Sequence, residues 1–158
     1  MKRPFDTKIK TEKELKTLQL DELKWTVNHV YNGSAYYRKK LEEAGVTPGD
    51  IKALEDIRKL PFTTSKDLQE DYPFPLRSVP FEKIVRIHAS SGTTGKRKVL
   101  CYTAKDVDDW AEMFARCYSY ADCTIEDRLQ IAVGNGVWTD GWGFHKGCER
   151  FGAMSISL

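Results

Sequence analysis

The chain has 158 residues, of which 41% are hydrophobic and 30% charged, the proportions of a folded globular protein. Its 25 basic and 23 acidic side chains nearly cancel, so no overall charge calls for nucleic acid or an anionic membrane as a partner. No segment approaches the roughly 18 apolar residues that a membrane helix needs. The N-terminus MKRPFDTKIK also lacks the apolar stretch of a signal peptide. A cytoplasmic protein with free thiols is therefore expected, since the 4 cysteines form no C-x-x-C pair.

The first half of the chain is expected to be helical. Apolar residues at steps of three and four predict an amphipathic helix that ends just before Ser34. Ser34 is a suitable N-cap for a second helix ending at Gly45. Short helices are predicted at about 51–57 and 66–71, before two prolines break the chain. Residues 1–75 are thus interpreted as a helical segment.

From residue 84 the hydrophobic period changes from helix to strand. The segments IVRIHA and VLCYT predict two strands joined by a polar loop. Thr103 and Asp106 form a capping box for a helix to about Ala121. One side of that helix is predicted core: Val107, Trp110, Ala111, Phe114, Tyr118 and Ala121.

The rest of the chain reads as a β-α-β unit, which implies a parallel sheet and an α/β fold. Its parts are a strand (RLQIAV), a glycine-rich turn (GNGVWTDGWG), a helix to about Gly152 and a final strand (MSISL). The chain ends on a strand that should need neighbours and covering helices, so it looks cut.

The loop between the first two strands, within ASSGTTGKRKV, combines hydroxyl residues, glycines and cations and contains no acid. Gly92 and Gly95 allow positive φ and a close approach of backbone amides to a ligand. Hydroxyl donors and cations surround them: Ser90, Ser91, Thr93, Thr94, Lys96, Arg97 and Lys98. This composition suits a polyphosphate, and the alternative is a solvated hairpin turn.

Three other sites find little support in the sequence. A Walker loop needs Ser or Thr after Gly-Lys, where this chain has Arg97. The later GNGVWT is a near-miss of a dinucleotide-binding fingerprint, because its third glycine is replaced by Thr139. His145 and Cys148 could share a helix face, but two ligands do not make a metal site, so none is predicted.

The segment Ser90–Lys96 (SSGTTGK) resembles the signature phosphate loop of adenylate-forming enzymes, and the nearer match is the phenylacetate–coenzyme A ligase family. Further hallmarks occur in order: VYNGSAYYRKKLEEAGV, LPFTTSKDL, HASSGTTGK, YTAKDVDDW and GWGFHKGCERFGA. The resemblance covers roughly residues 18–158. Arg97 departs from the proline usual in the family, and family members are several hundred residues long.

The resemblance implies an incomplete N-terminal part of the adenylate-forming ligase fold, with 76–158 as the first part of the AMP-binding domain. It implies that ATP and an aryl carboxylate give an acyl adenylate and pyrophosphate, and that coenzyme A then gives the thioester. ATP, Mg²⁺ and coenzyme A would be co-substrates in phenylacetate catabolism. The family residues that bind magnesium and ribose, and the family's catalytic lysine, would all lie beyond Leu158.

The resemblance also implies roles for individual residues. Ser91, Gly92, Thr93, Thr94, Gly95 and Lys96 would contact the β- and γ-phosphates, with Ser90 as a further donor and Lys98 as a supporting cation. His145, with Phe144, would belong to the catalytic element beside the acyl pocket. Trp138, Trp142 and Phe144 would line that pocket. For His145 and the aromatics, ordinary packing is the alternative.

Other interpretations stay open at this point. The chain could be a non-catalytic phosphate-binding fragment, or the N-terminal part of a synthetase that adenylylates a deazaflavin coenzyme. The 158 residues alone are expected to form no acyl–coenzyme A. A homodimer is a further expectation from the family.

Overall fold

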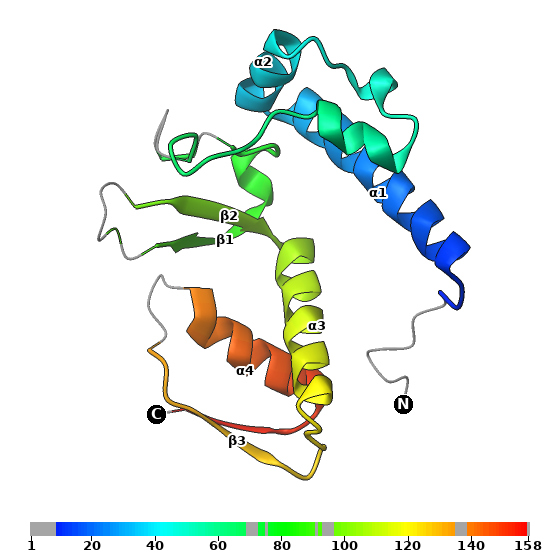
Figure 1. Cartoon of the computed structure of the whole chain (residues 1–158). Helices are drawn as coiled ribbons and strands as arrows, with labels where there is room; N and C mark the ends of the chain where they lie inside the picture. The colour runs from blue at the N-terminus through cyan, green and yellow to red at the C-terminus, as the bar shows by residue number, and fades with distance from the viewer. Residues whose placement is uncertain are drawn as a thin grey trace. The chain divides into compact units, whose positions relative to one another are not determined.

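The structure is a computed structural model that describes residues 9–68, 73–74, 76–90, 92, 97–134 and 139–157 (Figure 1). The chain divides into two compact units, Thr7–Phe81 and Glu82–Leu158. Within the described ranges, no helix has the length and apolar character needed to cross a membrane.

The unit Thr7–Phe81 is built on two helices, α1 (Glu12–Gly33) and α2 (Ala35–Glu43). Thr11 and Glu14 form a capping box that starts α1. Ser34 ends α1, and its side chain accepts a hydrogen bond from the Tyr37 amide to start α2. The predicted cap at Ser34 is therefore confirmed.

The core of this unit gathers residues from both helices and from the chain after them. Its buried members are Val27, Leu41, Val46 and Ile51, with Leu23, Val30, Tyr31 and Leu60 packed against them. The short helix predicted at 51–57 is present in part, but it begins later than predicted, because Ile51 is buried in a non-helical segment and a 3-10 helix occupies Leu54–Lys59. The Asp56 carboxylate caps the start of that helix, because it accepts hydrogen bonds from the backbone amides of Lys52 and Ala53 at 2.7 and 2.8 Å.

A polar cluster ties α2 to the segment that follows. Asp67 is 9% exposed, forms an ion pair with Lys40 at 2.8 Å, and accepts hydrogen bonds from Tyr36 and from the Thr64 amide. The bond from Lys40, followed by those from Tyr36 and Thr64, holds the pKa of Asp67 far below its usual range. Residues 65–68 form a turn, and the remainder of the helix predicted at 66–71 lies outside the described residues.

The unit Glu82–Leu158 contains two small sheets and two helices. Strands β1 (Ile84–Ala89) and β2 (Val99–Thr103) form an antiparallel hairpin, followed by α3 (Ala104–Tyr120). Strands β3 (Arg128–Ile131) and β4 (Met154–Ser157) pair in parallel through α4 (Thr139–Phe151). The predicted β-α-β unit with a parallel sheet, and the capping box of Thr103 and Asp106, are confirmed.

Helix α4 begins earlier than predicted. The sequence was expected to remain a glycine-rich turn as far as Gly143, but the helix starts at Thr139. Packing explains the difference, since α4 lies directly against α3 (Figure 1). A Cβ at Gly143 would meet the Phe114 ring at 2.6 Å, and one at Gly147 would meet the Phe114 Cβ at 2.2 Å. The glycines therefore serve close helix approach rather than a turn.

Helix α3 confirms most of its predicted core side but not its end. Ala111 is buried, as is Ala115, which was not predicted. Ala121 is exposed because it is the C-cap residue, beyond the last helical turn. Arg150 of α4 adds a bond to Glu112 of α3, 2.7 Å from Nε to the carboxylate.

The substitution Gly147→Ala should destabilise the chain, because the new methyl group would meet the α3 backbone at 3.0 Å as well as the Phe114 side chain. Backbone atoms cannot rotate aside, so the expected loss of unfolding free energy is about 3 kcal/mol, at the upper end for overpacking. Urea unfolding followed by circular dichroism measures it. Gly134→Ala is the matched control, since no atom of the described residues lies within 4 Å of the place that its new methyl group would take. Equal midpoints for the two variants would contradict this packing.

Candidate functional site

The predicted phosphate loop is carried at the end of the β1–β2 hairpin. Two hydrogen bonds close the hairpin where the loop begins: the Ser90 amide donates to the Lys98 carbonyl, and the Lys98 amide donates to Ser90 Oγ, both at 3.0 Å. We call Ser90 and Lys98 the hairpin neck. Because Ser90 takes part in both bonds, the loop between Ser90 and Lys98 begins and ends at residues that are hydrogen-bonded to each other.

Within the loop, Gly92 has φ +76°, a left-handed conformation that favours glycine. The predicted ligands Ser91, Thr93, Thr94, Gly95 and Lys96 lie outside the described residues. The described parts of the loop therefore provide its neck and one left-handed glycine. Such a backbone can turn amide hydrogens toward an anion.

Two side chains of β1 lie on the sheet face that leads to the neck. His88 is 2% exposed, and its ring lies 4.8 Å from the Tyr102 ring of β2 and 5.1 Å from the Trp110 ring of α3. Arg86, two residues earlier, stacks its guanidinium 5.0 Å above the Trp142 ring of α4. The hairpin is thus attached to both helices of its unit.

Of the predicted pocket residues, Phe144 packs against α3 and Trp142 contacts β1. The Phe144 ring packs edge-on against Phe114 at 5.0 Å, and the Phe144 carbonyl accepts a hydrogen bond from the Tyr118 hydroxyl at 3.0 Å. Burial is the main cause that raises the pKa of Tyr118 to about 12, so this phenol stays a donor near neutral pH. Trp142 contacts Arg86, and Trp138 lies outside the described residues.

His145, the predicted catalytic residue, is held by two serines of β4. Its Nδ1 lies 2.6 Å from Ser155 Oγ and its Nε2 lies 3.1 Å from Ser157 Oγ. The ring is 9% exposed. Because a hydroxyl can donate or accept, both nitrogens can stay bonded in either tautomer. This contact fixes α4 on β4 beside Phe144.

Cys148 shares the buried side of α4 with His145. Its thiol is 0% exposed and donates to the Ala153 carbonyl at 3.4 Å, and burial raises its pKa. Among the residues that the structure describes, no three His, Cys, Asp or Glu side chains converge as metal ligands. This thiol therefore packs as a small buried side chain.

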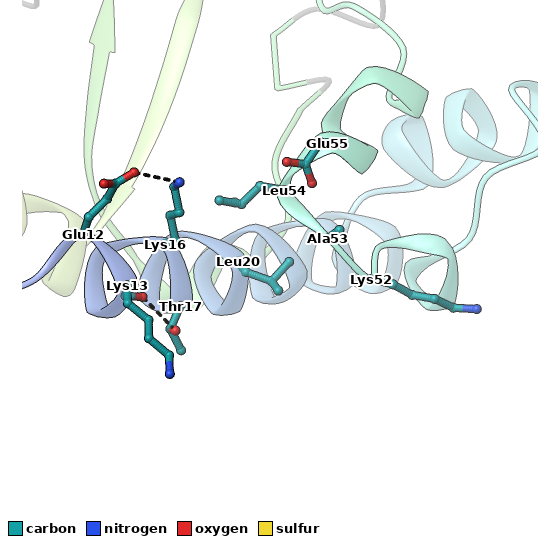
Figure 2. Close-up of a pocket in the computed structure, with 9 residues that line it drawn as sticks. All are labelled: Glu12, Lys13, Lys16, Thr17, Leu20, Lys52, Ala53, Leu54 and Glu55. Atoms are coloured by element: carbon teal, nitrogen blue, oxygen red, sulfur yellow. Dashed lines mark hydrogen bonds and ion pairs between the residues drawn. The ribbon is translucent and has the colours of Figure 1, made fainter.

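A shallow groove of about 520 Å³ lies in the unit Thr7–Phe81, between α1 and residues 52–55. Figure 2 shows Lys16 paired with Glu12 at 2.7 Å along one wall, while Lys13 and Lys52 extend away from the groove. None of the predicted site residues lines it. Its walls are mostly charged side chains with two leucines, Leu20 and Leu54, so they lack a convergent set of polar groups.

Arg86 and His88 are not among the site residues predicted from the sequence. Both lie in the predicted strand IVRIHA, where they alternate with apolar residues and so share one face. That alternation is the signal in the sequence that points to Arg86 and His88. Two polar residues on one face of a strand must either face solvent or be buried with a structural or functional role.

The substitution Ser90→Ala should loosen the hairpin neck, because it removes the acceptor of the Lys98 amide. A lost hydrogen bond of this kind costs about 1 kcal/mol, so exchange of the Lys98 amide hydrogen should accelerate about fivefold. Hydrogen exchange followed by NMR measures this. Ser90→Thr keeps the hydroxyl and should exchange like the original. Unchanged exchange in the alanine variant would show that the neck does not depend on Ser90.

Three curated relatives match the chain over most of its length, and all are named phenylacetate–coenzyme A ligase. The relative from Escherichia coli K12 is 48% identical over 145 residues, which are 92% of this chain and 33% of that protein. The relative from Aromatoleum evansii is 45% identical over 94% of this chain and 34% of its own length. The relative from Thermus thermophilus is 44% identical over 92% of this chain and 33% of its own length.

The chain therefore spans about a third of the length of these relatives. No protein-family model matches the chain.

Solved structures show the same relationship. A 2-hydroxyisobutyryl-CoA ligase in complex with 2-HIB-AMP and CoA, in the thioesterification state, superposes with a TM-score of 0.85 at 28% identity, over 92% of this chain and 32% of that one. Its open conformation, also with 2-HIB-AMP and CoA, superposes with a TM-score of 0.84 at 25% identity. The superposition covers 93% of this chain and 35% of that one. The chain is therefore homologous to an N-terminal portion of the phenylacetate–coenzyme A ligases, and its α/β fold is part of the adenylate-forming CoA ligase fold.

Proposed function

We propose that the chain is the phosphate-binding part of an AMP-forming carboxylate–coenzyme A ligase that acts on phenylacetate or a related aryl acid. The observation that carries the proposal is the loop SSGTTGK at the end of a hairpin closed by Ser90 and Lys98, in a chain 48% identical to a phenylacetate–coenzyme A ligase. The relatives' names do not favour the deazaflavin alternative.

In this proposal, the loop stabilises the charge that develops on pyrophosphate when a carboxylate attacks the α-phosphorus of ATP. Amides at Gly92 and Gly95, and the hydroxyls of Ser91, Thr93 and Thr94, would donate to the β- and γ-phosphates. Lys96 would add a cation. Donors that are already oriented toward developing charge lower the barrier without reorganising during the reaction.

Lys98 has a second role in the proposal. It is half-buried at the hairpin neck, where its backbone bonds Ser90 through both amide and carbonyl. Its ammonium would support the phosphate charge from the base of the loop. Mg²⁺, when bound, would neutralise part of the charge of the phosphates.

The acyl pocket belongs to the same proposal. Trp138, Trp142 and Phe144 would form its aromatic wall, and the packing of Phe144 on Phe114 supports a fixed position for that ring. His145 would lie beside the pocket. The two serine contacts of its ring favour a role in holding α4 over a role in proton transfer.

The wider assignments follow from the relatives. Residues 1–75 would be a helical N-terminal segment and 76–158 the first part of the AMP-binding domain. ATP, coenzyme A and an aryl carboxylate would be the partners in a cytoplasmic enzyme of phenylacetate catabolism, and a homodimer is part of the same proposal. The 158 residues alone would form no acyl–coenzyme A.

The proposal predicts activity for a chimera in which this chain replaces the matching part of the Escherichia coli relative. Given ATP, Mg²⁺, phenylacetate and coenzyme A, the chimera should release pyrophosphate and form the thioester. Lys96→Ala or Thr94→Ala should lower the adenylation rate about a hundredfold, the usual cost of losing one such donor. A coupled pyrophosphate assay measures both rates.

Lys39→Ala is the matched control, since that side chain lies on α2 with 78% of its surface exposed, and it should leave the rate unchanged. An inactive chimera across a panel of carboxylates would contradict the ligase proposal. Thioester formation by the 158-residue chain alone would contradict its predicted inactivity.

A further inference from the structure

His88 is a buried histidine for which the proposed reaction has no use. It is 2% exposed, and neither ring nitrogen has a hydrogen-bond partner among the described residues. A neutral imidazole carries one N–H, so a donor is left without an acceptor. Burying such a group without a partner is unfavourable, and its presence in a folded protein calls for a reason.

The position of His88 suggests that reason. Its backbone lies two residues before Ser90 of the hairpin neck, and its ring contacts the Tyr102 ring of β2 and the Trp110 ring of α3. The His88 side chain of β1 therefore packs against both β2 and α3. The ring contacts continue from Trp110 to Phe114 at 5.6 Å, and Phe114 packs on α4.

The surroundings of the ring oppose a positive charge. The described groups that face it are Arg86 from β1, Tyr102 from β2 and Trp110 from α3, and Arg86 is the charged one among them. Burial, and then the charge of Arg86, lower the pKa of His88 below its ordinary value of 6.5. A protonated His88 ring would be buried beside the cation of Arg86. The ring contacts of His88 with Tyr102 and Trp110 are therefore favoured while the ring is neutral.

We propose that His88 is a positioning residue for the phosphate loop: its neutral ring holds the base of the β1–β2 hairpin on α3, and protonation releases that base. The proposal rests on the proposed function, because it assigns the loop above the neck to polyphosphate. It adds that acid weakens polyphosphate binding through a residue that does not touch the ligand.

The sign of the effect follows from linkage. A histidine whose folded pKa is depressed binds its proton more readily when the hairpin base has opened. Its stabilising contribution is fully present above about pH 6.5 and is lost as the pH falls below that value, until the lowered pKa of the folded state is reached. The neck should therefore open more often at pH 5.5 than at pH 7.5.

Hydrogen exchange of the chain tests the opening directly. The Ser90 and Lys98 amides both donate across the neck, so their protection, corrected for intrinsic exchange, reports its closure. The Ala115 amide, in the buried part of α3, serves as the reference for global unfolding. Protection at the neck should fall between pH 7.5 and 5.5, by at most about tenfold because pH 5.5 lies about one unit below the ordinary histidine pKa of 6.5, and by more than at Ala115.

The variant His88→Phe supplies an aromatic ring that does not titrate, and its neck protection should not change with pH relative to Ala115. Should that variant fail to fold, His88→Gln keeps a polar side chain without the titration. An equal pH response in the original chain and the variant would overturn the proposal. So would a neck that shows no pH response in the original chain.

Titration with inorganic pyrophosphate separates this proposal from the proposed function. Binding, followed by the fluorescence of the chain's tryptophans, should weaken on acidification more in the original chain than in His88→Phe, which corrects for protonation of pyrophosphate itself. An equal loss in both would overturn the positioning role. Binding unaffected by Lys96→Ala would instead contradict the phosphate-loop assignment, while the exchange measurement would still decide whether His88 controls the neck.

Discussion

The close contact of Phe114 with Gly143 and Gly147 is the constraint on which the unit Glu82–Leu158 depends. A Cβ at either glycine would overlap the Phe114 side chain, so α4 can approach α3 this closely only where side chains are missing. That approach places Phe144 on Phe114 and brings its carbonyl to the Tyr118 hydroxyl. It also carries β4 alongside β3, because α4 is the crossover between these parallel strands.

Helix α3 links this packed pair to the loop that the proposed function assigns to phosphate. Trp110 contacts His88 of the hairpin on one side and Phe114 on the other. Arg86 adds a direct contact from β1 to Trp142 of α4. The neck at Ser90 and Lys98 therefore rests on strands that are held by aromatic contacts rather than by a wide sheet. Groups that lie far from the loop in sequence can thus affect how firmly its base is held.

Much of this arrangement could be predicted because it depends on local signals. The capping box at Thr103 and Asp106 and the alternation in IVRIHA act within a few residues, and β-α-β order alone implies a parallel pair. The start of α4 could not, because glycine disfavours helix and only the fit against Phe114 outweighs that preference. The serine partners of His145 and the burial of His88 likewise depend on contacts between elements, which the sequence does not display. The 3-10 helix at Leu54–Lys59 begins later than predicted, after Ile51, whose burial in the core also depends on contacts between elements.

Binding of polyphosphate at the loop above the Ser90–Lys98 neck can be tested by mapping the amide chemical-shift changes of the chain during titration with pyrophosphate. We expect the changes to concentrate in residues 90–98, with Gly92 and Gly95 among the largest. Gly134 and the groove residues Leu20 and Leu54 should change little. Changes centred on the groove, or none within 90–98 at millimolar pyrophosphate, would show that polyphosphate does not bind at this loop.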